Sequence, residues 1–201
     1  MTPLLSVLLA YLIGAIPFGY LLVRWKTGGD IRASGSGNTG ATNVLRTTGI
    51  VSGVATLLLD IAKGYVAVWL ADRASSGSSF WMSLAALAVM AGHAYPIFLG
   101  FKGGKAVASF IGAFLRLVPL ATIAMLVVFL VVVAKTRYIS LGSVIAAATF
   151  PLAVWLIFQP PLAIETAALA AAIFIIYRHR ANIQRLQQGT EHLLSFGARR
   201  S

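Results

Sequence analysis

Long apolar stretches separated by short polar segments dominate this sequence. Stretches of about 20 residues without a charge recur along it, and a helix of about 20 apolar residues crosses the hydrocarbon core of a membrane. We therefore predict an all-α, polytopic integral membrane protein in which residues 1–201 form a single helical bundle. The spans predicted from this pattern are residues 3–23, 50–71, 80–99, 106–115, 117–134, 139–158 and 162–177.

The segment from Lys105 to Ala134 is too long for one ordinary span. It contains Arg116 and Pro119, which together favour a break, so we divide it into a short helix and a full span. The short helix covers only about half of a bilayer. We therefore expect it to be tilted, to lie inside the bundle or to thin the membrane locally.

The distribution of basic residues supports this division. If residues 105–134 crossed the membrane once, the basic C-terminal segment would lie outside, against the excess of Lys and Arg expected in cytoplasmic loops. With the N-terminus outside and the division made, every Lys and Arg except Lys63, Arg73 and Arg116 lies on the cytoplasmic side. We therefore predict about seven transmembrane helices, one of them short, and a cytoplasmic C-terminus.

Composition narrows the classes of function. Only 10% of the residues are charged, against about 25% in soluble domains, and the net charge is +11. A basic excess suits nucleic acid, anionic lipids or anionic substrates, but membrane topology and lipid headgroups account for most of it. We therefore expect no nucleic-acid partner. The chain has no cysteine, no histidines at zinc-ligand spacing and few acidic residues near its polar segments, so we expect no metal and no cofactor.

The first polar segment runs from Ser34 to Asn43 and is rich in glycine, serine, threonine and asparagine. Glycines permit positive φ and let successive backbone N–H groups converge on an anion. Arg46 follows three residues after Asn43 and would lie on the same side of a helix that starts there. A flexible polar loop is the alternative, and we favour the anion site.

The second polar segment ends in Gly103-Gly104-Lys105, directly before the short helix. Free N–H groups, the positive end of the helix dipole and a lysine together suit a phosphate. The spacing differs from that of a P-loop. We expect Lys105 to contact phosphate and Lys102 to be an ordinary interfacial anchor, and His93, earlier in the segment, is consistent with a satisfied interior histidine.

The third polar segment, Arg178 to Glu191, caps the last span. If it is helical, His179 and Asn182 share a face at i, i+3, and Arg178, Asn182 and Arg185 also align. Taken alone, this segment is typical of a basic membrane-exit helix that binds lipid headgroups.

Two polar features lie within or at the edge of predicted spans. Asp60 and Lys63 are three residues apart, and a mutually neutralising structural pair is favoured over a functional site. Ser140 and Ser143 lie near the cytoplasmic start of the span 139–158 and could reach the same pocket. Ser143 is one turn deeper, so we expect it, more than Ser140, to line a cavity.

A cytoplasm-facing cationic pocket with neutral donors and almost no acids suits one or two phosphates. The Asp-x2-Asp-Gly pattern of CDP-alcohol phosphotransferases is absent, as is the His-x4-Asp dyad of the common glycerolipid acyltransferases. An anion or phosphate-ester transporter is the alternative function. A transporter needs a site near the middle of the membrane that opens to both sides, whereas these polar segments lie on one side.

Together, the three segments resemble the bacterial acyl-phosphate:glycerol-3-phosphate acyltransferases. The resemblance rests on Ser36–Asn43 with Arg46, on Gly92-His93 with Phe101–Lys105, and on His179–Ile183 with Gly189–Glu191. It extends to Asp60-x2-Lys63-Gly64 and covers nearly the whole chain. The one local departure is Ala106, at a position where glycine is expected as often as alanine.

The resemblance implies a seven-helix enzyme of the bacterial inner membrane with its active site on the cytoplasmic face, and we expect this enzyme to be a monomer. It implies transfer of an acyl chain from an acyl phosphate to the 1-hydroxyl of glycerol 3-phosphate, with lysophosphatidic acid and phosphate as products. This is the first step of bacterial phospholipid synthesis. The expected partners are these two small molecules and the lipid bilayer.

By position, the resemblance places catalysis on Ser36, Arg46, Lys105, His179 and Asn182. The expected ligands of acyl phosphate are Ser36, Gly37, Asn38, Thr42, Arg46 and Lys105, to which we add Ser143. The expected ligands of glycerol 3-phosphate are Gly103, Gly104, Lys105, His179 and Asn182. Glu191, Asp60 and Lys63 are expected to be structural. Because no histidine–carboxylate dyad is present, we expect a phosphate oxygen of the donor to take the hydroxyl proton, with His179 as the rival base.

Overall fold

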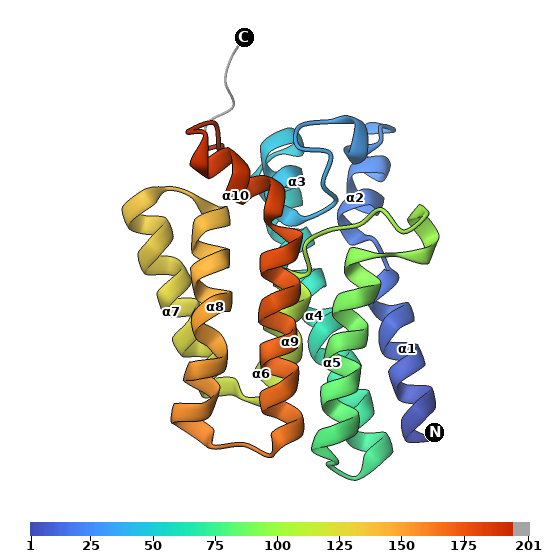
Figure 1. Ribbon diagram of the computed structural model, residues 1–201. Helices are drawn as coiled ribbons and strands as arrows, with labels where there is room; N and C mark the ends of the chain where they lie inside the picture. Colours follow the sequence, from blue (N-terminus) through green and yellow to red (C-terminus); the bar gives the residue numbers. More distant parts are fainter. Residues whose placement is uncertain (195–201) are drawn as a thin grey trace.

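The computed structural model describes residues 1–194, and every regular element in this range is a helix. The α-helices are α1 (Pro3–Ala15), α2 (Phe18–Thr27), α3 (Ala41–Thr48), α4 (Ile50–Ser75), α5 (Ser79–Ala94), α6 (Val107–Leu117), α7 (Pro119–Thr136), α8 (Ile139–Phe158), α9 (Leu162–Arg178) and α10 (Arg180–Gln187). Two 3-10 turns, η1 (Ile31–Ala33) and η2 (Ile97–Leu99), lie in the connections. Figure 1 shows the long helices side by side in a bundle, with α2, α3 and α10 at one end.

The predicted fold class, a helical membrane bundle with one short helix, is confirmed. Within residues 1–194, five helical segments are long and apolar enough to cross a membrane, and α1 with α2 counts as one of them. A sixth is obtained if α9 and α10, bent by 55° relative to each other, form one span. The short apolar helix α6 is the remaining element of the predicted set.

The first predicted span, residues 3–23, is longer than expected and is broken in its middle. α1 ends at Ala15 and α2 continues from Phe18 to Thr27. Pro17 causes the break, because it has no N–H for a helical bond and keeps the preceding residue out of the helical region. The carbonyl oxygen of Ile16 accepts a hydrogen bond from Nζ of Lys63, at 2.9 Å. A side chain of α4 therefore satisfies the backbone at this break.

Prolines also set two other helix boundaries. The span predicted at residues 80–99 ends as an α-helix at Ala94, because Pro96 follows and only the turn η2 continues to Leu99. The predicted break between the short helix and the following span is confirmed. α6 ends at Leu117, and Pro119 opens α7 at a position where a missing N–H costs no helical bond.

The short helix α6 lies inside the bundle, which decides among the three arrangements expected for it. Its residues 109–114 are buried, and the ring of Phe110 packs against Phe150 of α8 with centroids 4.8 Å apart. Gly64 of α4 and Gly112 of α6 lie directly against the backbone of the opposite helix. A side chain at either glycine would collide with that backbone, so the close packing of α4 and α6 depends on both glycines.

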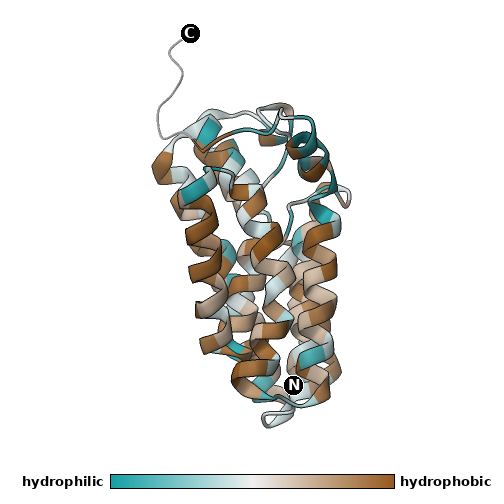
Figure 2. Cartoon of the chain, turned by 60° about the vertical axis from the view of Figure 1, so that its left-hand side comes forward, coloured by the Kyte–Doolittle hydropathy of each residue, from teal (hydrophilic) through white to brown (hydrophobic). Residues whose placement is uncertain are grey.

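All three polar segments lie at one end of the bundle, which we call the polar end and define by α2, α3, α10 and the loop 95–106. Figure 1 shows these elements together. Figure 2 shows apolar residues along the helices and hydrophilic residues gathered toward the polar end. The loops that connect the helices therefore bring three segments that are far apart in the sequence to the same side of the protein.

Candidate active site

The first polar segment folds around the buried side chain of Asn43, in the first turn of α3. Its Nδ2 donates to the carbonyl oxygens of Ser34, at 3.0 Å, and Asn38, at 2.8 Å. Its Oδ1 accepts the backbone N–H of Ser36 at 2.9 Å. Gly37 has a φ of 68°, which glycine adopts without strain. These bonds argue against a flexible loop. The other predicted ligands of this segment, Gly37, Asn38 and Thr42, lie in this loop or at the start of α3.

The glycine pair of the second segment is held by backbone bonds on both sides. The N–H of Gly103 donates to the carbonyl oxygen of Ala94 at 3.2 Å, and that of Gly104 donates to His93 at 3.1 Å. The carbonyl oxygen of Gly104 accepts two bonds from the guanidinium of Arg178, at 2.8 and 3.2 Å. The two glycine N–H groups thus already donate to carbonyls at the end of α5.

Ala106 joins the glycine pair to α6 in a left-handed conformation, with a φ of 63°. Residues with a Cβ rarely adopt this conformation, whereas glycine adopts it freely. The backbone geometry therefore explains why glycine is also expected at this position.

A chain of polar contacts joins the second and third segments. Nζ of Lys105 donates to Oδ1 of Asn182 at 2.5 Å, and Nδ2 of Asn182 donates to Glu191 at 2.7 Å. The carboxylate of Glu191 also accepts hydrogen bonds from Ser140 of α8, at 2.9 Å, and from Nε of Arg185, at 2.7 Å. Glu191 therefore ties α10 to α8 and orients Asn182, which supports a structural role for this carboxylate.

The chain that follows α10 brings the first segment to the same place. Nη2 of Arg46, in α3, donates to the carbonyl oxygen of His192 at 3.3 Å. His192 is the neighbour of Glu191 in the sequence, so Arg46 lies beside the contacts described above. We call Arg46, Lys105, Asn182 and Glu191, with Ser140 and Arg185, the polar network.

The last span bends at His179, between α9 and α10. Because of this bend, Arg178 and Arg185 do not lie along one face of a straight helix. Arg178 binds the carbonyl oxygen of Gly104, whereas Arg185 binds Glu191. The basic residues of this segment thus hold the site together, a role that the interpretation as a lipid-binding exit helix did not include.

His179 is buried at the bend, just past the end of α9. Its Nδ1 lies 2.8 Å from the carbonyl oxygen of Ile175. A carbonyl only accepts hydrogen bonds, so Nδ1 carries the proton and Nε2 keeps its lone pair. Burial lowers the pKa of His179 to about 4, and the positive charge of Lys105 acts in the same direction. The imidazole is therefore neutral at neutral pH.

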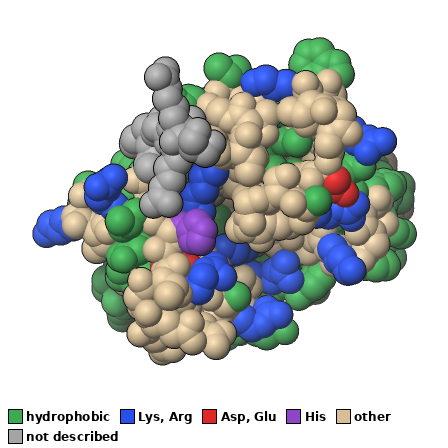
Figure 3. Space-filling view, turned by 90° about the horizontal axis from the view of Figure 1, so that it is seen from above, with side chains coloured by type: hydrophobic (Ala, Val, Ile, Leu, Met, Phe, Trp, Pro, Cys, Tyr) green, Lys and Arg blue, Asp and Glu red, His purple; other side chains and the backbone are tan. Residues whose placement is uncertain are grey.

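Lysine and arginine side chains are spread over the polar end, as Figure 3 shows from above, and acidic side chains are few there. Burial lowers the pKa of Lys105 to about 8. The charge of Glu191 opposes this shift, and the charges of Arg185, Arg46 and Arg178 reinforce it. The ammonium group of Lys105 is thus protonated at neutral pH but releases its proton more readily than an ordinary lysine.

Glu191 is the acidic member of the polar network. Burial alone would raise its pKa, but hydrogen bonds from Asn182, Ser140 and Arg185 outweigh burial and hold the pKa below its usual value. The carboxylate is therefore ionised at neutral pH and balances part of the surrounding positive charge. Among residues 1–194, no group of three or more His, Asp or Glu side chains is arranged to hold a metal ion.

Two predicted ligands stand apart from the polar network. The side chain of Ser36 is exposed, and within residues 1–194 no hydrogen bond joins it to the network. The hydroxyl of Ser143 donates to the carbonyl oxygen of Ile139, one turn earlier in its own helix, at 2.9 Å. We expected Ser143 to be the better placed of the two serines of α8, but it is Ser140 that reaches Glu191.

An open hollow of about 460 Å³ lies beside the first segment. Its lining includes Gly37, Lys102 and Arg32. Arg32 forms an ion pair with Asp30 at 2.7 Å, and Lys102 is exposed, as expected of an interfacial anchor. This hollow borders the first segment without including Lys105.

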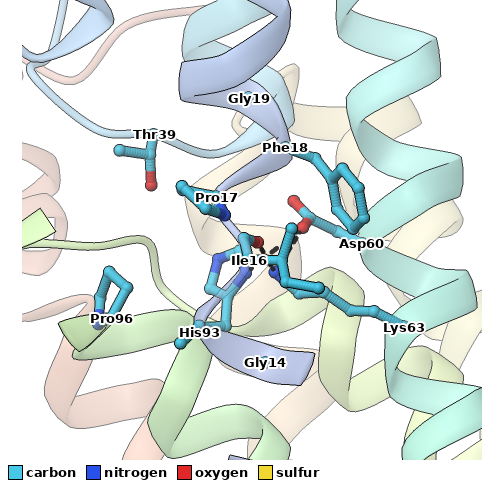
Figure 4. Close-up of a pocket in the computed structure, with 11 residues that line it drawn as sticks. Gly14, Ile16, Pro17, Phe18, Gly19, Thr39, Asp60, Lys63, His93 and Pro96 are labelled. Atoms are coloured by element: carbon cyan, nitrogen blue, oxygen red, sulfur yellow. Dashed lines mark hydrogen bonds and ion pairs between the residues drawn. The ribbon is translucent and has the colours of Figure 1, made fainter. Parts of the chain in front are cut away.

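The expected pair of Asp60 and Lys63 forms inside the bundle, with Oδ1 and Nζ 2.7 Å apart. Nδ1 of His93, in α5, lies 3.5 Å from the same carboxylate oxygen. Figure 4 shows these side chains around a cavity of about 10 Å³, with Thr39 of the first segment also on its wall. Sequence reasoning found the pair but missed its third member, because spacing along one helix says nothing about a neighbouring helix.

The fold and the site together define a polytopic helical membrane protein with a cationic site, suited to phosphate, at one end. A family model described as "Glycerol-3-phosphate acyltransferase" matches residues 4–189. A glycerol-3-phosphate acyltransferase of Geobacter sulfurreducens is 50% identical over 183 residues, which cover 91% of this chain and 93% of the relative. One of Geotalea daltonii is 45% identical over 184 residues, covering 92% and 93%.

A solved structure agrees with these relatives. The crystal structure of PlsY (YgiH), an integral membrane glycerol 3-phosphate acyltransferase, in its glycerol 3-phosphate form matches with a TM-score of 0.91 and 38% identity, covering 96% of each chain. Its lysophosphatidic acid form matches with a TM-score of 0.89 and 36% identity, again covering 96% of each chain. The chain therefore belongs to the glycerol-3-phosphate acyltransferase family.

The lowered pKa of Lys105 predicts how phosphate binding depends on pH. We expect the affinity for glycerol 3-phosphate to fall as pH rises through about 8, because the ammonium group loses its proton there. Calorimetric titration of the purified protein between about pH 7 and about pH 9.5 measures this, since the phosphate group itself titrates at about pH 6.

The control is Lys105→Arg, whose guanidinium stays charged over this range. We expect this variant to lose the alkaline decline even if its affinity is lower throughout. An unchanged decline in Lys105→Arg would show that another group controls binding.

Proposed function

We propose that the protein transfers an acyl chain from an acyl phosphate to the 1-hydroxyl of glycerol 3-phosphate, producing lysophosphatidic acid and inorganic phosphate. The observation that carries this proposal is the contact of Lys105 with Asn182, beside Arg46, because it gathers all three polar segments into one cationic site. The family membership and the glycerol 3-phosphate and lysophosphatidic acid forms of the matching structure support the substrate and the product. The reaction is the first step of bacterial phospholipid synthesis.

An acyl phosphate is a mixed anhydride whose phosphate is a good leaving group. The 1-hydroxyl oxygen attacks the carbonyl carbon, the bond from that carbon to the phosphate oxygen breaks, and the phosphate leaves with the electron pair. Positively charged side chains lower the barrier by stabilising the departing phosphate, and alignment of hydroxyl and carbonyl lowers it further. Lys105 and Arg46 are the cations of the polar network that suit this task.

The polar network suggests which residues bind each of the two substrates. The first segment and Arg46 bind the phosphate of the donor, His179 and Asn182 bind glycerol 3-phosphate, and Lys105 lies between the two phosphates. Gly103 and Gly104 contribute by shape, because their N–H groups donate to the backbone of α5. The residues proposed to bind acyl phosphate are Ser36, Gly37, Asn38, Thr42, Arg46, Lys105 and Ser143, and the residues proposed to be structural are Asp60, Lys63 and Glu191.

The proton of the hydroxyl goes to a phosphate oxygen of the donor in this proposal. A general base works best when its pKa is near the working pH. Burial holds the pKa of His179 at about 4, well below that value. The phosphate of the donor becomes more basic as its bond to the acyl carbon breaks, so one of its oxygens is suited to take the proton. His179 then serves to hold glycerol 3-phosphate through its neutral imidazole.

Lys105→Ala tests the proposed reaction. We expect phosphate release by the purified protein to require both substrates, and the variant to lose about 10²–10³-fold in kcat/KM, because one charged stabiliser of the leaving group is gone. Lys102→Ala is the matched control, since this lysine is exposed and lies outside the polar network. Near-normal turnover by Lys105→Ala would remove Lys105 from the phosphate site.

The same preparation separates the enzyme from a transporter. Protein reconstituted in liposomes should release phosphate from acyl phosphate and should not carry glycerol 3-phosphate across the bilayer. Flux of glycerol 3-phosphate without acyl phosphate, and no acyl transfer, would favour the transporter.

His179→Ala tests the source of the base. If the donor phosphate takes the proton, the variant should raise KM for glycerol 3-phosphate while kcat falls less than about tenfold, because a lost general base typically costs about 10²–10⁴-fold. His179→Gln, which keeps a neutral hydrogen-bonding group, should recover part of the affinity. Loss of most of kcat with both substrates still bound would identify His179 as the base.

We further propose that the protein lies in the bacterial inner membrane as a monomer, with its N-terminus outside and its polar end and C-terminus in the cytoplasm. The concentration of Lys and Arg at the polar end supports this orientation. Light scattering of the purified protein in detergent measures its mass and so tests whether it is a monomer.

Single cysteines test the orientation, because the chain has no cysteine of its own. In spheroplasts, an impermeant maleimide should label Ser76→Cys, in the turn between α4 and α5. It should label Gln187→Cys, at the end of α10, only after the membrane is permeabilised. Both positions are exposed and lie at opposite ends of the bundle. The reverse pattern would invert the proposed topology.

A further inference from the structure

The buried side chains of Asp60, Lys63 and His93 form a cluster that the proposed reaction does not use. Asp60 and Lys63 already neutralise each other at 2.7 Å, yet the Nδ1 edge of the His93 ring faces the same carboxylate at 3.5 Å. Figure 4 shows the three side chains converging below the break at Pro17. A histidine is not needed for charge balance here, so its presence calls for another function.

The opposite edge of the His93 ring lies against Gly104. A Cβ placed on Gly104 would collide with Nε2 of the ring, and its next nearest neighbours are two other ring atoms. The backbone also connects the two residues, since the N–H of Gly104 donates to the carbonyl oxygen of His93 at 3.1 Å. On its other side, Gly104 accepts hydrogen bonds from Arg178. Gly104 is thus enclosed between a histidine ring and a guanidinium group.

We propose that His93 is a positioning residue for Lys105. Its Nδ1 faces Asp60, which pairs with Lys63, and the opposite edge of the imidazole is the surface on which Gly104 rests, one residue before the lysine that contacts Asn182. Lys63 also binds the carbonyl oxygen of Ile16 at 2.9 Å, so the cluster is anchored to the break between α1 and α2. This proposal rests on the proposed function, because it gives the cluster a role in placing a phosphate ligand.

The position of Lys105 depends on the backbone that His93 supports at Gly104. Its ammonium group lies 2.5 Å from Asn182, and a shift of the backbone at Gly104 moves the neighbouring residue that carries this group. Misplacement of a catalytic group by about 1 Å can cost about 10²-fold in rate. Three buried ionisable groups are also costly to keep inside a membrane protein, and such groups are usually functional.

A double-mutant cycle with Gly104→Ala and His93→Ala tests the contact between the ring and Gly104. In the wild-type background, Gly104→Ala should lose about 10²-fold in kcat/KM, because the new methyl group collides with the ring and displaces Lys105. In a His93→Ala background, the ring is gone and the same substitution should cost less than about threefold.

Gly103→Ala is the matched control. A Cβ at Gly103 would collide with the carbonyl oxygen of His93 and with Pro96, neither of which changes when the His93 side chain is removed. Gly103→Ala should therefore cost the same in both backgrounds. Equal costs of Gly104→Ala in the two backgrounds, or an equal relief of both glycine substitutions, would overturn the proposal.

The kinetic constants of His93→Ala separate positioning from a purely structural role. We expect KM for glycerol 3-phosphate to rise about tenfold in the monodisperse protein, because a misplaced Lys105 binds phosphate less well. A normal KM and kcat per folded molecule would leave His93 with only a structural role and would overturn the proposal.

The thermal unfolding midpoint of each variant gives a second readout that needs no activity. Gly104→Ala should lower the midpoint in the wild-type background and change it little in the His93→Ala background, whereas Gly103→Ala should lower it in both. If wild-type protein showed no acyl transfer, the proposed function would fail while this pattern still reported on the contact between His93 and Gly104. Equal shifts for Gly104→Ala in both backgrounds would overturn the contact itself.

Discussion

Backbone polar groups that lie within hydrocarbon must be paired inside the protein, because no water is there to bind them. Regular helices meet this requirement along most of this chain, and two irregular segments meet it with cationic side chains. Lys63 binds the carbonyl oxygen of Ile16 at the Pro17 break, and Arg178 binds that of Gly104 in the loop before α6. A positive side chain thus satisfies the backbone at these two irregular segments, whereas the amide of Asn43 does so in the first polar segment.

The same need for pairing also determines where the polar side chains of the site lie. The chain leaves the helical conformation near the polar end, where glycines, asparagines and serines supply neutral donors and acceptors. Glu191 accepts hydrogen bonds from three side chains there and joins α10 to α8. The basic excess at this end therefore has two uses. Some cations satisfy the backbone and hold the segments together, while Lys105 and Arg46 belong to the site that is suited to phosphate.

The spacing of residues along the sequence predicts contacts within one helix but not contacts between helices. The glycine pair before Lys105 has the composition of an anion-binding loop, but its N–H groups donate to carbonyls at the end of α5. The pairing of Asp60 with Lys63 was predictable, since both lie on one helix at a spacing that brings side chains together. The third member of that cluster, His93, was not, because it comes from a different helix. Spacing also placed Ser140 and Ser143 near the same end of one helix, but the hydrogen bond of Ser140 to Glu191 depends on where the chain after α10 lies.

The sequence by itself determined the helical membrane fold, the division of residues 105–134 and the three polar segments, because hydrophobic length and proline position act locally along the chain. Its resemblance to a known family pointed to the same segments as the site. Only the tertiary structure decided how those segments meet. The contact of Lys105 with Asn182, the bonds of Asn43 within the first loop and the packing of His93 against Gly104 depend on helix packing. Such packing is set by side chains far apart in the sequence, and periodicity along one helix does not encode it.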